Sequence, residues 1–270
     1  MSRKKVISRE YKLVLNTENF SGNEAESGKK IEKFWRNLEE VYPGKLKFGK
    51  KSGKIKSNRE IRFFDTVNAL LDSHHYIFRE RKDINNNQRE VTLKFRHPDR
   101  YISQDRDIRA RGPNSETKFE EDIKAPFNVL YSFSTTKTID DNDVYKKLKH
   151  IKKHYPGFSL TDQEDNDEEK LVQVNEHLVR ETVIAGPSIQ LLDKPLTEAE
   201  CALIIWYQGN SLSPNPVIIE FSFRYGDRKG RYSATLAKAA HDFFHTVQNQ
   251  MKHWLGNANS TKTGFIYANK

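Results

Sequence analysis

The segment 217–225 of the chain, VIIEFSFRY, alternates two kinds of side chain in the way expected of a β-strand with two different faces. Side chains along a strand point to opposite sides with a period of two residues. One face therefore carries only apolar groups, from Val217 to Tyr225, and the other face carries Ile218, Glu220, Ser222 and Arg224. Such a strand can pack one face on a core while the other presents charge.

Four further segments show the same alternation: 4–16, 76–83, 89–97 and 117–124. Another strand is expected near 171–183, with Arg180 on its charged face. Together, these charged faces would carry eight cations against four anions, a surplus of four positive charges. The cations are Lys12, Arg79, Arg81, Lys94, Arg96, Lys118, Arg180 and Arg224, and the anions are Glu10, Glu120, Asp122 and Glu220.

An ordinary antiparallel sheet with one wet face would explain any one of these segments. Several charged faces together are better explained by a closed barrel, whose apolar faces turn outward against helices and whose charged faces turn inward. A polar interior suits water and a charged ligand: the positive surplus suits a polyphosphate, and the carboxylates suit a hard divalent cation. We therefore predict an α+β protein, an antiparallel β-barrel enclosing a phosphate tunnel, with helices packed on its outside.

The rest of the chain is interpreted around this barrel. Apolar residues at helical spacing predict helices over 24–42, 141–154 and 231–255, and further strands are expected at 57–70 and 202–208. We expect a single domain over 1–270, with a core of about 4–255, insertions near 20–56 and 125–170, and a C-terminal tail. Within that tail, 262–267 is expected to be one more strand or a cover over the tunnel mouth.

Composition limits the classes of function. The chain has 46 Lys and Arg residues against 37 Asp and Glu residues, and the net charge of +9 predicts a preference for anions. No run approaches the roughly 18 apolar residues of a membrane span. The first twelve residues, MSRKKVISREYK, lack the apolar core of a signal peptide, and the single Cys201 fits a reducing compartment. We expect a soluble, cytoplasmic protein with no membrane partner, and the oligomeric state stays open.

The charged strands also occur in an order that resembles the CYTH superfamily, the triphosphate tunnel metalloenzymes that include thiamine triphosphatase and class IV adenylate cyclases. The resemblance extends over roughly residues 8 to 225. The segments that carry it are SREYK at 8–12, FRER at 78–81, TLK at 92–94, KFEED at 118–122, VR at 179–180 and EFS at 220–222. They correspond to the family's opening Glu-x-Glu-x-Lys strand, its basic strands, its basic-x-Glu-x-acidic strand, a later arginine strand and a terminal acidic strand.

This resemblance implies a function and a role for each residue. The activity implied is divalent-metal-dependent hydrolysis of inorganic, nucleoside or thiamine triphosphate, in which water attacks the terminal phosphorus. Glu10 and Lys12 would be the catalytic residues, with Lys12 near that phosphate. The triphosphate would be bound by Lys12, Arg79, Arg81, Lys94, Arg96, Lys118, Arg180 and Arg224. The ligands of Mg²⁺ or Mn²⁺ would be Glu10, Glu120, Asp122 and Glu220.

Two positions depart from the family pattern. Ser8 stands in place of the first glutamate of the opening motif, and Ser222 stands in place of the second acid of the terminal strand. In the family, these acids help to hold metal ions or to position water. The alternative function is therefore a non-catalytic tunnel that binds triphosphate, polyphosphate or RNA. An adenylate cyclase ranks below both, because no base-reading pocket can be identified.

A lysine-rich segment supplies the strongest competing signal. Six lysines lie within 45–56: Lys45, Lys47, Lys50, Lys51, Lys54 and Lys56. They form either a solvated hairpin or a basic ribbon for RNA, DNA or long polyphosphate, since such clusters neutralise phosphates. No nucleic-acid-binding motif accompanies the segment. A nucleic-acid partner is therefore possible but unsupported by a motif.

Overall fold

The strands of the chain lie around a central axis. The computed structural model describes residues 4–22, 24–161, 164–209, 215–258 and 260–268. Its strands are β1 (Ser8–Leu15), β2 (Leu46–Lys47), β3 (Ile55–Thr66), β4 (Tyr76–Asp83), β5 (Arg89–His97), β6 (Ser115–Lys124), β7 (Asn128–Ile139), β8 (Leu171–Gln173), β9 (Val179–Leu192), β10 (Thr197–Gln208) and β11 (Ile218–Gly226). Its α-helices are α1 (Glu24–Val41), α2 (Leu70–Ser73), α3 (Arg100–Asp105), α4 (Leu148–His154), α5 (Ala234–Gln250) and α6 (Lys262–Tyr267).

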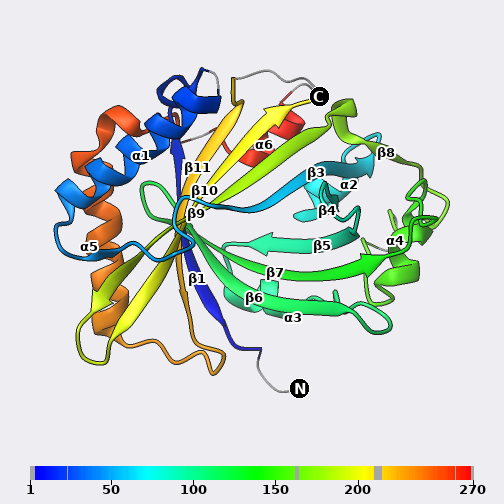
Figure 1. Cartoon of the computed structure of the whole chain (residues 1–270). Coiled ribbons are helices and arrows are strands. Elements are labelled where there is room, and N and C mark those ends of the chain that lie inside the picture. The colour runs from blue at the N-terminus through cyan, green and yellow to red at the C-terminus, as the bar shows by residue number, and fades with distance from the viewer. Residues whose placement is uncertain (1–3, 23, 162–163, 210–214, 259, 269–270) are drawn as a thin grey trace.

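Nine of these strands close into a barrel (Figure 1). Within the described residues, the order around the ring is β9-β10-β11-β1-β6-β7-β5-β4-β3, and β3 pairs again with β9. The short strands β2 and β8 attach to β9 and β3. The predicted barrel with outer helices is confirmed. One detail differs, because β1 and β6 pair in parallel while the other pairs are antiparallel.

Some predicted elements have other bounds. Strands β4 and β5 begin and end where the alternation predicts. Strand β7 lies inside the region that was expected to be an insertion. The sequence did not predict this strand, because its inward face carries small hydroxyl groups, Ser132, Ser134 and Thr136, which make a weak strand signal. Helix α4 covers only the second half of 141–154. The segment 262–267 is a short helix, α6, and not a strand.

Helices α1 and α5 cover the outer face of β9, β10, β11 and β1 (Figure 1). Their apolar stripes supply fully buried side chains such as Phe34, Leu38 and Phe243. Beneath them, the outward faces of the strands are aromatic, and the rings of Tyr11 and Phe223 stack with centroids 4.5 Å apart. Ser233 begins α5, and its side chain accepts a hydrogen bond from the backbone N–H of Leu236. None of the described helices has an apolar stretch long enough to cross a bilayer.

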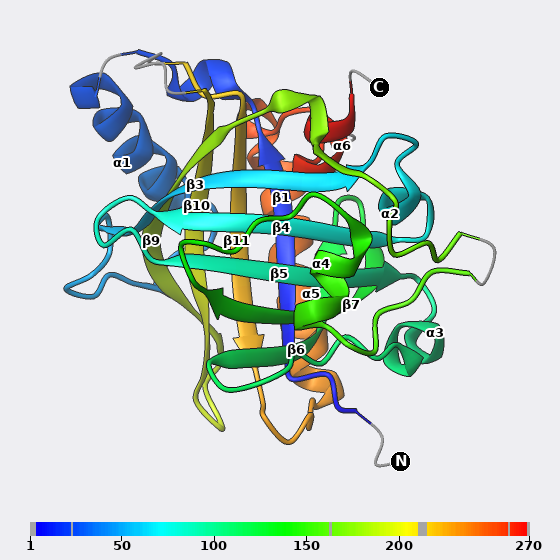
Figure 2. The same cartoon turned by 90° about the vertical axis from the view of Figure 1, so that its right-hand side faces the viewer.

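The opposite wall, made by β4, β5, β6 and β7, is covered by α4 and the chain that follows it (Figure 2). The outward side chains Phe78, Leu93 and Phe133 pack there against Leu148 and Ile151, among others. Tyr155 is also fully buried, and its hydroxyl donates to the carbonyl oxygens of Val91 at 3.0 Å and Thr135 at 3.1 Å. Because both walls turn their apolar faces outward, their charged faces are left to line the interior.

Helix α6 covers one end of the barrel (Figures 1 and 2). Ile266 on this helix is fully buried in a small apolar cluster with inward-facing strand residues such as Phe63 and Trp206. The hydroxyl of Tyr267 donates to the carboxylate of Asp65 at 2.8 Å. The barrel interior is thus apolar at the end beneath α6.

Candidate functional site: a cationic cavity inside the barrel

The barrel encloses a cavity of about 270 Å³, and half of its lining residues are charged. Among the described residues, nine cations and four anions line it, so the cavity is strongly positive. The cations are Lys12, Arg59, Arg79, Arg81, Lys94, Arg96, Lys118, Lys124 and Lys262, and the anions are Glu10, Glu120, Glu181 and Glu220. A cavity of this size and charge suits a small polyanion.

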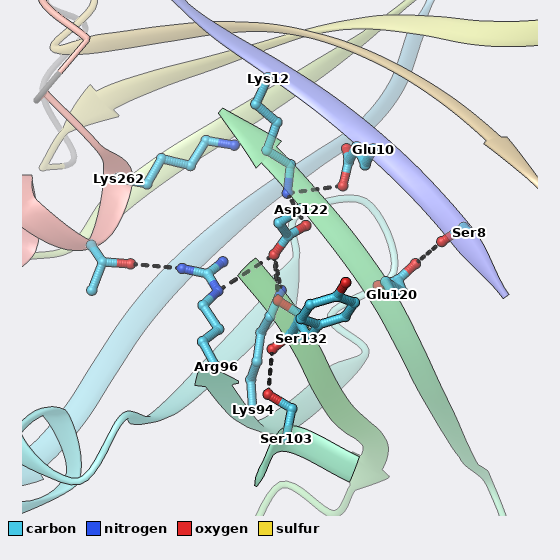
Figure 3. A network of polar contacts seen from close by, with 12 residues as sticks. Ser8, Glu10, Lys12, Lys94, Arg96, Ser103, Glu120, Asp122, Ser132 and Lys262 are labelled. Atoms are coloured by element: carbon cyan, nitrogen blue, oxygen red, sulfur yellow. Dashed lines mark hydrogen bonds and ion pairs between the residues drawn. The ribbon is translucent and has the colours of Figure 1, made fainter. Parts of the chain in front are cut away.

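Asp122 on β6 is the centre of a polar network at one wall (Figure 3). Its side chain is only 1% exposed. Lys12 Nζ donates to Asp122 Oδ1 at 2.7 Å, and Lys94 Nζ donates to Oδ2 at 3.0 Å. The hydroxyl of Ser132 also donates to Oδ2, and Arg96 Nε lies 3.5 Å from the same oxygen. We call Lys12, Lys94, Arg96, Asp122 and Ser132 the Asp122 cluster.

The cations of this cluster keep Asp122 ionised. Burial by itself would raise the pKa of Asp122, but Lys12, Lys94 and Arg96 hold that pKa well below its usual range. Burial would likewise lower the pKa of Lys12, yet Asp122 and Glu10 raise it, and Glu10 lies 2.9 Å from Lys12 Nζ. Lys12 therefore stays charged. Asp122 positions the lysines, and its predicted role as a metal ligand stays a prediction.

Two lysines of the cavity have lowered pKa values. Burial and the neighbouring Arg96 lower the pKa of Lys94 to about 7, although Asp122 opposes that shift. Burial, Arg96 and Lys12 lower the pKa of Lys124 to about 8. Part of the positive charge in the cavity therefore titrates close to neutral pH.

Strands β3 and β4, beside β5, carry guanidinium groups with few partners among the described residues. We call Arg59, Arg79, Arg81 and Glu181 the Arg79 cluster. The Nε atoms of Arg79 and Arg81 are buried, and neither forms a hydrogen bond with any described residue. The nearest contacts of Glu181 with Arg59 and Arg81 are both 4.0 Å, too long for hydrogen bonds. Arg79 forms no ion pair within the described part of the chain.

Burial and the neighbouring charges shift the pKa values of Arg79 and Glu181. Burial, and then the neighbouring Arg81, lower the pKa of Arg79 to about 9, at which the group is still charged at neutral pH. Burial would raise the pKa of Glu181, but Arg81 and Lys262, together with a hydrogen bond from Trp206 Nε1 at 3.0 Å, lower it to about 2. Glu181 is therefore ionised but does not pair closely with these arginines, whereas Glu90 Oε1 lies 3.4 Å from a terminal nitrogen of Arg81.

The other two carboxylates that were predicted to bind metal also have partners. The hydroxyl of Ser8 donates to Glu120 Oε1 at 2.6 Å, and Lys262 Nζ donates to Glu220 Oε1 at 2.7 Å. Across the described residues, no three Asp, Glu, His or Cys side chains gather closely enough to hold a metal ion. The carboxylates as arranged do not fit a preformed site for Mg²⁺ or Mn²⁺.

The structure places two predicted site residues elsewhere. Arg180 does not face the cavity, because Glu181 and Val183 do, and Arg180 shares the outer face of β9 with the buried Ile184. Its guanidinium lies over the ring of Tyr207, 5.1 Å from the centroid. Arg224 is not among the residues that line the cavity, and its guanidinium group pairs with Glu200 at 3.2 Å. The expectation that Arg180 faces the cavity is thereby corrected.

Several lining residues were not predicted. Lys124 shares the alternation of Lys118 to Asp122 on β6, so that pattern could have identified it. Arg59 shares the inward face of β3 with the apolar Ile61 and Phe63, so that face reads as apolar and the arginine was not recognised. Lys262 reaches the cavity from α6, far from every charged strand in the sequence, and only the docking of that helix brings it there.

The lysine-rich segment 45–56 lies apart from this cavity. None of its six lysines is among the residues that line the cavity. Lys45 pairs with Asp193 at 3.2 Å, and Lys47 pairs with Glu198 at 2.8 Å. The segment therefore contributes no charge to the interior, and a nucleic-acid partner for it stays a prediction.

No protein-family model and no curated protein matches the chain. Solved structures are similar to it over nearly its whole length. One is a Hippeastrum protein described as a candidate adenylyl cyclase with a dominant triphosphatase activity, at 13% identity and a TM-score of 0.46, covering 98% of this chain and 97% of the other. Another is a candidate adenylate cyclase from Bacillus halodurans, at 15% identity and a TM-score of 0.46, covering 97% and 98%.

A third similar structure is a candidate adenylate cyclase from Vibrio parahaemolyticus, at 7% identity and a TM-score of 0.36, covering 98% of this chain and 99% of the other. All three structures are described as candidate adenylate cyclases, and only the Hippeastrum protein is described with a triphosphatase activity. At these scores the likeness carries no argument about activity. The function has to be inferred from the cavity itself.

Proposed function

We propose that the chain binds a triphosphate-containing small molecule in the barrel cavity and hydrolyses its terminal phosphoric anhydride bond. The observation that supports this most directly is that the buried Nε atoms of three cavity arginines, Arg79, Arg81 and Arg96, have no hydrogen-bond partner among the described residues, and that Arg79 forms no ion pair there. A buried cation without an anion is costly, and a bound anion offsets that cost. Guanidinium groups bind phosphate oxygens in planar, charge-assisted pairs.

The rest of the cavity suits phosphoryl transfer. Catalysis of this reaction consists mostly of holding the substrate and neutralising the charge that develops on it. Arg79 and Arg81 on β4 would hold phosphate oxygens together with Lys94 on the neighbouring β5 and Lys12 on β1, both of which are anchored on Asp122. Water would attack the terminal phosphorus, the anhydride P–O bond would break, and the diphosphate product would take the electron pair. The proton of the attacking water would pass to a phosphate oxygen or to solvent.

Metal dependence stays a prediction within this proposal. The carboxylates predicted to hold Mg²⁺ or Mn²⁺ pair instead with lysines or with Ser8. A divalent ion would have to displace an ammonium group from at least one of them. No step proposed above depends on such an ion.

The same contacts favour a second function, binding of a triphosphate without hydrolysis. Glu10 pairs with Lys12. Ser8 stands where the family's opening motif has its first glutamate, and its hydroxyl donates to Glu120. Lys12 lowers the pKa of Glu10 against the effect of burial, so this carboxylate is a weak base for activating water. Binding and hydrolysis therefore have to be measured separately.

The test is phosphate release from inorganic triphosphate, ATP and thiamine triphosphate, with and without Mg²⁺ or Mn²⁺. Thermal-shift binding is recorded on the same samples. Release establishes hydrolysis, and the substrate ranking identifies the organic group. Stabilisation without release identifies the binding protein. If neither signal appears for any of the three compounds, the proposal is wrong.

A further inference from the structure

We infer that Lys262 is a built-in cation that takes, at Glu220, the place of a divalent metal ion. Lys262 Nζ lies 2.7 Å from Glu220 Oε1, and the two side chains are only 20% and 10% exposed. The lysine comes from α6 and the glutamate from the middle of β11, so the pair joins distant parts of the chain. Figure 3 shows Lys262 extending from its helix towards Lys12 and Glu10.

Helix α6 holds Lys262 in this position through contacts of its own. Its far end is anchored by the fully buried Ile266 and by the hydrogen bond from Tyr267 to Asp65. The side chain of Asn175 donates to the backbone carbonyl of Ile266 at 2.7 Å, and the ring of Phe265 stacks on His177 with centroids 5.4 Å apart. The position of the ammonium group is therefore fixed by α6, a helix that is itself packed against the barrel.

The charges around Lys262 match a monovalent cation. Ser222, two residues after Glu220 and on the same inward face, supplies a hydroxyl in place of a second carboxylate. Glu220 is the described carboxylate in direct contact with Lys262, although the charge of Lys262 also lowers the pKa of Glu181 and of Glu10. In the direct pair one carboxylate and one ammonium group cancel, whereas a divalent ion is usually held by more than one carboxylate. The ammonium of Lys262 also lies 5.7 Å from the centroid of the Trp206 ring, a contact that stabilises an organic cation.

A consequence follows for ligand binding. If Lys262 neutralises Glu220, a polyanion can enter the cavity without a divalent ion at this carboxylate. This consequence rests on the proposed function, but the assignment of Lys262 does not, because metal binding can be measured with no anion present.

The test is calorimetric titration of Mn²⁺ alone into the full chain and three variants. In K262M the ammonium group is removed while the stem that packs in the cavity is retained. We expect K262M to bind Mn²⁺ at least about tenfold more tightly than the wild type, because Glu220 is left with an uncompensated buried charge. The double variant K262M/E220Q should lose that gain. K252M, which alters an exposed lysine after α5, is the matched control and should behave as the wild type.

Three results would overturn the inference: equal Mn²⁺ affinity in wild type and K262M, no Mn²⁺ binding in either, or a gain that survives the E220Q change. Thermal melts confirm that each variant is folded, and K262Q replaces K262M if the methionine variant does not fold. Inorganic triphosphate is then titrated in the presence of a chelator. Failure of every variant to bind it would contradict the proposed function, and the Mn²⁺ titrations would still decide the role of Lys262.

Discussion

The Asp122 cluster and the Arg79 cluster of the barrel interior differ in how their cations are paired. In the Asp122 cluster, both lysines donate directly to one buried carboxylate, at 2.7 and 3.0 Å. In the Arg79 cluster, Glu181 lies 4.0 Å from two of the arginines and Glu90 lies 3.4 Å from Arg81, but Arg79 forms no ion pair among the described residues. The buried Nε atoms of Arg79 and Arg81 have no hydrogen-bond partner there, as is also true of Arg96 in the Asp122 cluster. The first cluster is stabilised by the protein itself. The second is short of an anion, which a ligand can supply.

This difference shows that buried charges in one cavity have two roles. Some are compensated by other groups of the protein, and others are left available to bind an anion. A buried charge is tolerated when an opposite charge and hydrogen bonds compensate it. Asp122 supplies that compensation in its own cluster and fixes where Lys12 and Lys94 point. In the Arg79 cluster the compensation is incomplete, so a bound anion would offset the cost of burying Arg79. The following predictions would break or sharpen this comparison, beginning with the largest expected effect.

The largest effect is expected from D122N. The substitution preserves shape but leaves Lys12, Lys94 and Arg96 facing one another without their shared carboxylate. We expect the free energy of unfolding to fall by about 3–5 kcal/mol, the range found when one partner of a buried ion pair is removed. Chemical denaturation monitored by circular dichroism measures this. Unchanged stability would show that the Asp122 cluster does not hold the wall together.

The next effect concerns R79A, which should weaken binding of inorganic triphosphate roughly 100-fold, because a buried charge-assisted contact to phosphate is lost. Stability should be unchanged or increased, since the substitution removes a buried cation with no partner among the described residues. Calorimetric titration and a thermal melt give the two values. R180A is the matched control: Arg180 faces outward, so its affinity should equal that of the wild type. If R79A binds triphosphate with the affinity of the wild type, the Arg79 cluster is not part of the binding site.

A smaller effect is expected from pH. The pKa of Lys94 is lowered to about 7 from its usual 10.5, so in the empty cavity this lysine is mostly charged at pH 6 and mostly neutral at pH 8.5. Binding a polyanion then requires uptake of a proton above pH 7. Compared with K94R, which stays charged, the wild type should lose affinity by up to about tenfold for each pH unit above 7.

The measurement for this prediction is the ratio of the triphosphate dissociation constants of wild type and K94R between pH 6 and 8.5. Titration of the ligand and of Lys124 is common to both proteins and cancels in the ratio. A ratio that stays constant over this range would show that Lys94 keeps its charge, held there by Asp122.

The smallest effect is expected from S132A. The hydroxyl of Ser132 donates to Asp122 but carries no charge. Its loss should lower the free energy of unfolding by about 1–2 kcal/mol, as for one hydrogen bond to a buried charged group. The same denaturation assay measures it, with S134A on the same strand as the control. A loss as large as that of D122N would mean that the hydroxyl, and not the charge pairing, organises the cluster.

The alternation of side chains along the strands was enough to predict much of this site. It places Glu10 and Lys12, Lys94 and Arg96, and Glu120 and Asp122 on the inward faces where the structure has them. This succeeds because a strand's period of two is local and needs no knowledge of which strands pair. It failed at Arg180, which was expected on the charged inward face of a strand near 171–183, because the outward packing of Ile184 places that arginine outside the barrel.

The sequence by itself determined that apolar and charged faces would be separated, and hence that closure would produce a charged interior beneath outer helices. Only the tertiary structure decided which charges are paired. Asp122 receives lysines from β1 and β5, Arg79 pairs with no carboxylate among the described residues, and Lys262 arrives from α6 to pair with Glu220. The physical reason is that pairing depends on the order of strands around the ring and on helix docking. Both are set by contacts between residues far apart in the chain, which no local pattern records.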